Sequence, residues 1–271
     1  MSSEPHAPPG HGAPTHENMS AFSEDTQKAG TVAVILCAGQ GTRMGATQNK
    51  VFLPLLGKPL LVYTIEAFQR ARTVDEIVLV AHPDEVDFCR EEIVRKYGLV
   101  RVRHIFAGGA SRHQSEQRAL EALRGRIEGG EIGVILVHDG ARPFVPPVEI
   151  DALIRLAREE GGALLASAVA ADETIARVDE NGCVAAILPA HDLWRAQTPQ
   201  AFAAPTLLAA YDAARADGFE GTDTAATFER AGNTVRVLAG SPDNFKVTTP
   251  DDLLRAERIA RALESATRGA K

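Results

Sequence analysis

The chain has 271 residues, of which 45% are hydrophobic, 24% charged and 5% aromatic, and its formal net charge is −7. This balance is typical of a soluble globular protein, whereas the negative charge and the scarcity of aromatic side chains argue against nucleic-acid binding. Three widely spaced cysteines argue against a disulfide scaffold or a zinc ribbon. No apolar run approaches the roughly 20 residues that cross a bilayer, and no signal peptide is recognisable. We therefore expect a cytoplasmic protein without membrane contact.

The first 29 residues are rich in Pro, Gly, Ser, Glu and His and offer little to bury, so we expect a disordered tail at 1–29 and one domain at 30–271. Strands are predicted at 31–37, 76–81, 101–106, 133–137, 163–169 and 234–238. Helices are predicted at 59–71, 84–97, 113–126, 147–159, 204–215, 222–231 and 250–266. Because the strands are apolar on both faces and helices connect them, the pattern indicates an α/β fold with a mostly parallel, Rossmann-like sheet.

One segment departs from this alternation, at about 171–188. Two short strand-like runs flank Asp179-Glu180-Asn181-Gly182, and Asn-Gly is a strong hairpin signal because both residues tolerate positive φ. We expect a β-hairpin arm that projects from the domain and buries its apolar side chains in a homodimer.

A glycine-rich segment, AGQGTRMG at 38–45, follows the first strand directly. Glycines at the carboxyl end of a strand allow backbone N–H groups to approach a phosphate closely. Met44 occupies the third glycine position of the dinucleotide fingerprint, and the Lys-Ser/Thr of a P-loop is missing. The remaining interpretation is a nucleoside triphosphate loop that carries its own cations, Arg43 and Lys50.

Five further motifs follow in order: GGASRHQS (108–115), VHDGARPFV (137–145), LWRAQTPQAF (193–202), GTDTA (221–225) and DNFKVTTPDDL (243–253). With the glycine segment, they resemble the cytidylyltransferases that make 4-diphosphocytidyl-2-C-methylerythritol in the non-mevalonate isoprenoid pathway. The resemblance covers residues 31 to 260. It implies a fold of the nucleotide-diphosphate-sugar transferase type, with CTP and a polyol phosphate as substrates and Mg²⁺ or another divalent cation as cofactor.

The chemistry of cytidylyl transfer fits these residues. The attacking phosphate monoester is already ionised near neutral pH, because its second pKa is about 6. The enzyme therefore needs cations and a metal to align two polyanions, rather than a general base. Asp139 follows a buried strand, where a carboxylate is a natural Mg²⁺ ligand, while we expect the neighbouring His138 to have a structural role.

The resemblance assigns roles to the matching positions. It implies catalytic roles for Arg43, Lys50 and Lys246 and metal contacts for Asp139 and Asp243. It implies nucleotide binding by Ala38, Gly39, Gly41, Gly109 and Ser115 and substrate binding by Arg142, Thr174 and Thr222. Thr198-Pro199-Gln200 is expected to form a turn on the substrate side, and Trp194 is expected in the core.

The chain departs from the family pattern at two informative positions. The family usually has Pro immediately before the lysine of the glycine segment; here Asn49 stands there, and we expect it to loosen the end of the loop. Where the family has an Arg that reaches the acceptor's phosphate across the dimer, this chain has Ala190. Two alternatives stay open: a cytidylyltransferase for another polyol phosphate, such as ribitol 5-phosphate, and a catalytically weakened nucleotide-binding homologue.

Overall fold

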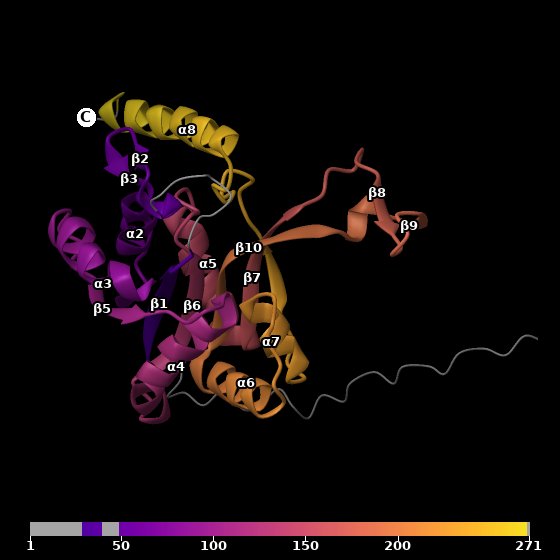
Figure 1. Cartoon of the computed structure of the whole chain (residues 1–271), viewed down its shortest axis with the longest axis horizontal. Helices are drawn as coiled ribbons and strands as arrows, with labels where there is room; N and C mark the ends of the chain where they lie inside the picture. Colours follow the sequence, from indigo (N-terminus) through magenta and orange to yellow (C-terminus); the bar gives the residue numbers. More distant parts are fainter. Residues whose placement is uncertain (1–28, 40–48, 270–271) are drawn as a thin grey trace, which may run out of the picture.

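The computed structural model describes residues 29–39 and 49–269. Within them, a seven-stranded sheet has the order β11-β7-β10-β6-β1-β4-β5 (Figure 1). Its strands are β1 (Gly30–Cys37), β4 (Glu76–Ala81), β5 (Val102–Ala107), β6 (Ile132–Asp139), β7 (Gly162–Ala168), β10 (Trp194–Ala203) and β11 (Arg236–Ala239). All neighbouring strands pair in parallel except β10, which runs antiparallel to both β6 and β7.

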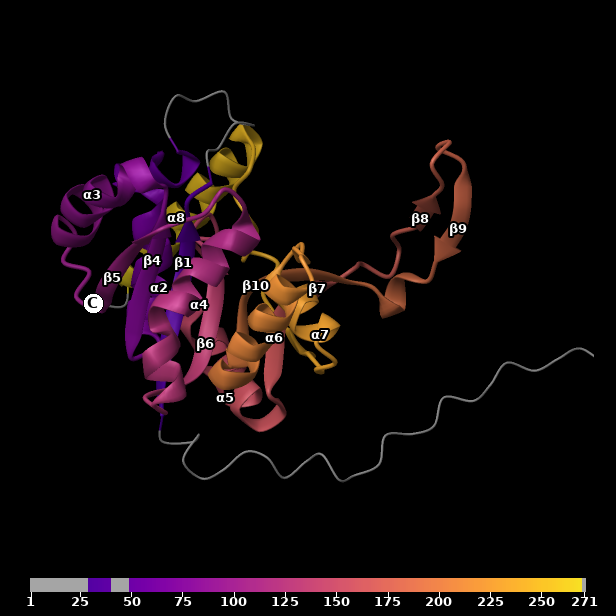
Figure 2. The ribbon, with the colours of Figure 1, turned by 60° about the horizontal axis from the view of Figure 1, so that its bottom comes forward.

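Helices cover both faces of this sheet (Figures 1 and 2). One layer contains α2 (Leu60–Arg70), α5 (Pro147–Glu160) and α8 (Pro250–Gly269), together with the short α3 (Val86–Phe88) and its π-helical continuation (Cys89–Arg95). The other contains α4 (Arg112–Glu128), α6 (Ala204–Ala216) and α7 (Thr224–Arg230). Shorter elements outside these layers include the β2 (Pro54–Leu55) and β3 (Lys58–Pro59) ribbon and the 3₁₀ turns Lys50–Phe52, Pro83–Glu85 and Ala190–Asp192.

Strand β1 shows why the apolar runs predict a doubly covered sheet. Ala33 and Ile35 pack into the core beneath α2 and α5, whereas Val32 and Val34 pack into the core beneath α4 and α6. Because successive side chains of a strand point to opposite faces, a strand buried on both faces must be apolar at every position. The six predicted strands are all present, with ends within two residues of the prediction, and the mostly parallel α/β fold is confirmed.

The sequence interpretation missed β10. Thr198-Pro199-Gln200, expected to be a turn, lies within this ten-residue strand, where a register irregularity separates Ala196 from Gln200 in the pairing with β7. Trp194, expected in the core, is 44% exposed at the strand's start. A proline within the run hides the strand in the sequence, since proline removes a ladder hydrogen bond and is confined to edges and irregular positions.

The predicted hairpin is present as an arm formed by β8 (Ile175–Val178) and β9 (Val184–Leu188). Figures 1 and 2 show it standing away from the sheet, beyond the end of β10. The Asp179 carboxylate accepts the N–H groups of Asn181 and Cys183, both at 2.9 Å, and Gly182 has a φ of +79°. Val178, Val184 and Ile187 are each more than half exposed. The arm therefore presents apolar side chains that this chain alone leaves uncovered.

The tail predicted at 1–29 lies, apart from Ala29, outside the described residues. No helix of the described chain is long and apolar enough to cross a membrane.

Candidate active site

A cavity of about 640 Å³ opens at the carboxyl ends of four neighbouring parallel strands, β1, β4, β5 and β6. Its walls come from the residues that follow these strands, from the start of α4, and from the segment before α8. Ligands of open α/β sheets bind at this edge, where the strands end and the connecting loops diverge. Seven residues predicted to form the site line the cavity: Ala38, Gly39, Lys50, Gly109, Ser115, Asp139 and Lys246.

Asp139, the last residue of β6, is the electrostatic centre of this cavity. It is 6% exposed, and its carboxylate pairs with Arg112 at 2.6 Å, Lys246 at 3.0 Å and Arg142 at 3.4 Å. Burial by itself raises the pKa of the carboxyl, but Arg112, Lys246 and Arg142 together hold it well below its usual range. Asp139 is therefore ionised at all physiological pH values.

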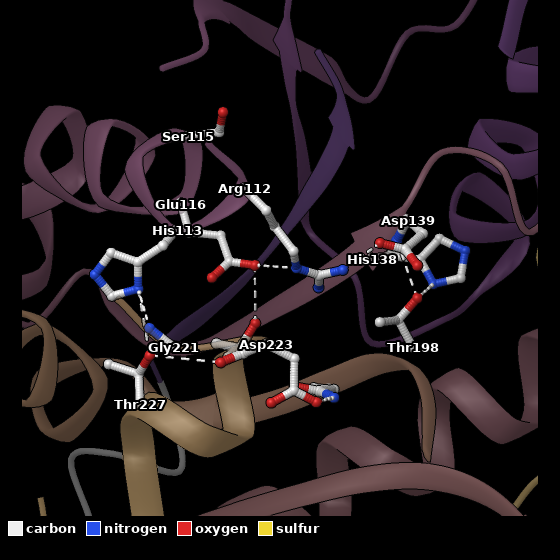
Figure 3. A network of polar contacts seen from close by, with 12 residues as sticks. Arg112, His113, Ser115, Glu116, His138, Asp139, Thr198, Gly221, Asp223 and Thr227 are labelled. Atoms are coloured by element: carbon white, nitrogen blue, oxygen red, sulfur yellow. Dashed lines mark hydrogen bonds and ion pairs between the residues drawn. The ribbon is translucent and has the colours of Figure 1, made fainter. Parts of the chain in front are cut away.

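His138, the residue before Asp139, is not among the residues that line the cavity. It is fully buried, and its Nε2 lies 3.1 Å from the Arg142 carbonyl oxygen. Its Nδ1 lies 3.1 Å from Thr198 Oγ1 (Figure 3). Because a carbonyl only accepts, Nε2 carries the proton and Nδ1 accepts from the threonine hydroxyl. Burial lowers the pKa of His138 to about 3, so the ring stays neutral. As expected, its role is structural.

Lys50 is positioned by Asn49, and here the expectation of a loosened loop end was wrong. The Asn49 side chain is buried; its Nδ2 donates to the Cys37 carbonyl at 2.7 Å and to Glu85 Oε2 at 2.9 Å. Its Oδ1 accepts the Val51 N–H at 3.3 Å and so caps the short helix that Lys50 begins. Proline has no such side-chain donors, so asparagine fastens this end rather than loosening it.

The glycine pair after β5 is required by close packing within the protein. A Cβ on Gly108 would meet the Ala38 Cβ at 2.7 Å, and one on Gly109 would meet the Gln114 Cβ at 2.5 Å. The Ser115 hydroxyl donates to the Ser111 carbonyl at 2.8 Å and accepts the Gly109 N–H at 3.0 Å. Ser115 therefore shapes the wall of the cavity, and its donor is already used within the loop.

The other predicted site residues lie elsewhere. Gly41 and Arg43 are outside the described residues. Arg142 touches Asp139 and donates to the Asn244 carbonyl at 2.8 Å, behind the cavity wall. Thr174 is exposed at the base of the arm, and Thr222 is exposed in the loop before α7. Asp243 is exposed and pairs with Arg255 at 3.1 Å, so it is not brought into the cavity.

Residues 31–262 match the family model of 2-C-methyl-D-erythritol 4-phosphate cytidylyltransferase. The enzyme of that name from Geobacter metallireducens is 46% identical over 84% of this chain and 97% of its own length, and that from Clostridium acetobutylicum is 40% identical over 84% and 96%.

The chain belongs to this family.

Solved structures of proteins with this activity in their names have the same fold as this chain. The 4-diphosphocytidyl-2C-methyl-D-erythritol synthase of Anaerococcus prevotii superimposes with a TM-score of 0.73 at 27% identity, over 86% of this chain and 99% of that one. The Thermus thermophilus cytidylyltransferase gives 0.66 at 29% identity, over 84% and 98%. As a member of the cytidylyltransferase family the chain is a nucleotidyltransferase, as its motifs predicted.

The sequence interpretation gave no site role to an arginine in the cavity of this cytidylyltransferase. Arg112, the first residue of α4, reaches Asp139 across 27 sequence positions and also pairs with Glu116 at 2.8 Å. The motif GGASRHQS contains this arginine, but nothing in the motif indicates that it pairs with an aspartate on another strand. The contact depends on β5 and β6 ending at the same edge of the sheet.

The donor set of the cavity fits magnesium with a single protein ligand. Among residues 29–39 and 49–269, no three His, Cys, Asp or Glu side chains cluster as a metal site. Magnesium, however, is usually held by one or two carboxylates together with substrate phosphates and water. Asp139, ionised and in the cavity wall, is such a carboxylate, although a metal would have to compete with Arg112, Lys246 and Arg142 for its oxygens. Asp243 lies outside the cavity lining and is engaged with Arg255.

Proposed function

We propose that this enzyme transfers the cytidylyl group of CTP to 2-C-methyl-D-erythritol 4-phosphate, giving 4-diphosphocytidyl-2-C-methyl-D-erythritol and pyrophosphate. Family membership supports the reaction. The structural observation that carries it is the pairing of Arg112 and Lys246 with Asp139 in a cavity that Lys50 also lines and that is large enough for a nucleotide.

The reaction begins with attack by a phosphate oxygen of the acceptor on the α-phosphorus of CTP. One P–O bond forms and the bond to the pyrophosphate leaving group breaks, with negative charge growing around the α-phosphorus. Since the acceptor's oxygen is already ionised, no base has to remove a proton. This agrees with a buried, neutral His138 that hydrogen-bonds only within the protein.

Cations supply the stabilisation that this transition state needs. Lys50, held at the cavity wall by Asn49, and Lys246, which pairs with Asp139, are the described lysines at the cavity. We propose that these lysines, together with Arg43, stabilise the negative charge that builds at the phosphates in the transition state. Ala38, Gly39, Gly41 and Gly109 are assigned to the nucleotide, where backbone without bulky side chains allows a close approach.

A magnesium ion would be held by Asp139 together with the nucleotide's phosphates, and would neutralise and orient those phosphates. Enzymes of this family use a divalent cation. The assignment of Asp243 as a second ligand requires that its carboxylate leave Arg255.

For the acceptor we propose a site completed by a second copy of the chain. Thr174 directly precedes β8, and the 3₁₀ turn Ala190–Asp192 follows β9. Figure 1 shows these two strands standing away from the sheet. An arm with exposed Val178, Val184 and Ile187 is suited to an isologous contact in a homodimer, which would bring these residues to the partner's cavity. Arg142 and Thr222 are assigned to the acceptor from the same chain.

The test is pyrophosphate release from CTP with Mg²⁺ and a panel of polyol phosphates. We expect 2-C-methyl-D-erythritol 4-phosphate to give the highest kcat/KM. Ribitol 5-phosphate is included because this chain has Ala190 where the family has an arginine. A higher kcat/KM for ribitol 5-phosphate would make that compound the acceptor in place of 2-C-methyl-D-erythritol 4-phosphate. If no acceptor caused the release of pyrophosphate, the alternative of a catalytically weakened nucleotide-binding homologue would be favoured.

A further inference from the structure

Glu116 is a buried carboxylate that the proposed reaction does not use. It lies on α4, one turn after Arg112, and only 2% of its surface is exposed. Three donors surround it: Arg112 Nε at 2.8 Å and Thr224 Oγ1 at 3.1 Å on one oxygen, and the Tyr211 hydroxyl on the other. Burial raises the pKa of the Glu116 carboxyl above its usual value, although the charge of Arg112 and the hydrogen bonds from Arg112, Tyr211 and Thr224 oppose this shift.

Arg112 connects this carboxylate to the cavity. Its Nε faces Glu116, and its Nη1 donates to Asp139 Oδ1 at 2.6 Å, so that the guanidinium lies between the two carboxylates (Figure 3). Burial by itself disfavours the charge, but Asp139 and Glu116 raise the pKa of Arg112 above its usual range. Its Nη2 is buried and has no hydrogen-bond partner among residues 29–39 and 49–269. Within this described part of the chain, the two carboxylates accept the hydrogen bonds of Nε and Nη1.

We propose that Glu116 is a positioning residue for cytidylyl transfer: by holding one edge of the Arg112 guanidinium, it keeps the other edge on Asp139. This inference rests on the proposed function. An arginine side chain has several rotatable bonds, and a single ion pair leaves much of that freedom in place. A second, buried carboxylate at Nε fixes both the position and the plane of the group.

The consequence for the reaction lies at Asp139. With Arg112 fixed on Oδ1, the other oxygen, Oδ2, is left to Lys246 at 3.0 Å and Arg142 at 3.4 Å. Without Glu116, Arg112 can tilt toward the phosphates or across both oxygens of Asp139, and the geometry around the α-phosphate becomes heterogeneous. Glu116 thus acts on orientation, so its loss lowers kcat more than it raises the KM for CTP.

Thr224 extends the connection to a second element. It is the first residue of α7, directly after Asp223, which accepts from Gln200 Nε2 at 2.9 Å and caps the helix at the Ala226 N–H. Glu116 is therefore anchored to α7 as well as to Tyr211 of α6. A carboxylate held from two other helices is a rigid support for the guanidinium, since no single side-chain rotation releases it.

Glu116→Gln tests the proposal, with Tyr211→Phe as the matched control. The glutamine keeps the size of the side chain but loses the charge that holds Arg112, and we expect kcat to fall about tenfold with the KM for CTP changed less than threefold. Tyr211→Phe removes a donor from the other oxygen of the carboxylate and leaves the charge on Arg112 in place; its melting temperature should fall, and its loss of kcat should be smaller than that of Glu116→Gln. If Glu116→Gln does not fold, Glu116→Asp, which shortens the reach to Arg112, should show the same kcat loss.

A double-mutant cycle with Arg112→Lys separates positioning from general stability. If Glu116 acts through Arg112, the effects of Glu116→Gln and Arg112→Lys on kcat are not additive, and the double variant is about as slow as Arg112→Lys alone. Additive effects, or a kcat in Glu116→Gln equal to the wild type, would overturn the proposal.

A second readout does not depend on the reaction. In ¹⁵N NMR spectra, the Arg112 Nε–H signal, identified by its absence in Arg112→Lys, should be protected from exchange in the wild type and lost in Glu116→Gln. An unchanged signal would refute positioning by Glu116. Failure of the proposed function is recognised separately, because the wild-type enzyme would then release no pyrophosphate. The Arg112 Nε–H signal would still show whether Glu116 holds the guanidinium.

Discussion

The Asn49 side chain joins the residue before Lys50 to the end of the first strand, because its Nδ2 donates to the Cys37 carbonyl at 2.7 Å. The same nitrogen donates to Glu85 at 2.9 Å. These bonds fasten both borders of the glycine segment to each other and to the turn after β4. These contacts therefore fix the backbone immediately before Lys50, the lysine that we assign to the phosphates.

Asn49→Ala should lower kcat about tenfold, since the helix that Lys50 begins loses both its cap and its tie to Cys37. Steady-state kinetics with saturating CTP measure the effect. Glu85→Gln is the control, because it leaves the bond to Cys37 in place, and we expect at most a twofold loss. Equal losses in the two variants would mean that the contact with Glu85, rather than the tie to Cys37, positions Lys50.

Lys50→Ala and Arg43→Ala should each lower kcat by about 10²–10³, or roughly 3–4 kcal/mol, with smaller effects on CTP binding. Charge at the α-phosphate grows on the way to the transition state, so these cations matter most there. CTP affinity measured by calorimetry separates binding from kcat. A Lys50→Ala enzyme with unchanged kcat would remove the catalytic assignment of this lysine.

Asp139→Asn should raise the Mg²⁺ concentration needed for half-maximal activity, because it removes the carboxylate that we assign to the metal. It also leaves Arg112, Lys246 and Arg142 without their common partner, so the melting temperature should fall as well. Titration of activity with Mg²⁺ distinguishes the two effects. Asp243→Asn shows whether the second assigned ligand contributes: an unchanged Mg²⁺ dependence would exclude it.

The buried His138 should make the fold sensitive to acid. Its pKa is lowered to about 3 in the folded state, while an unfolded histidine titrates near 6.5. Between these values the unfolded chain binds more protons, so stability falls as the pH drops from about 6.5 toward 3, by up to about 1.4 kcal/mol per pH unit. Urea unfolding at pH 7 and pH 5 should show a smaller difference for His138→Gln than for the wild type. His191→Gln, at an exposed position, should keep the wild-type difference.

The arm should hold together the homodimer that we propose. Ile187→Asp places a charge on its exposed apolar surface and should shift the chain toward the monomer, with a parallel loss of activity because the acceptor site would be incomplete. Sedimentation velocity at micromolar concentration measures the change. Val100→Asp is matched in exposure but lies on the body of the protein, and should leave the assembly intact. A wild-type chain that sediments as a monomer would contradict the assignment.

Much of the architecture follows from local patterns. Strands such as β1 and β6 are buried on both faces, so a continuous run of apolar residues predicts them from the sequence. The Asn181-Gly182 turn likewise predicts the hairpin of the arm. The cavity's place is also predictable, because the carboxyl ends of parallel strands share one edge of the sheet. That is why Asp139, at the end of β6, was predicted at the site from its place in the sequence, whereas Ala38 and Gly109 were assigned from the resemblance to the family.

The tertiary structure alone decided the pairings inside that cavity. Arg112, Lys246 and Asp139 come from three separate motifs, and their contact depends on the strand order that brings the ends of β5 and β6 to one site. Strand β10 escaped detection because Pro199 interrupts its pattern, and Asn49 was misjudged because its partner is twelve residues away. Periodicity reports which residues are buried, but hydrogen bonds and ion pairs form between groups that only the folded chain brings within 3 Å.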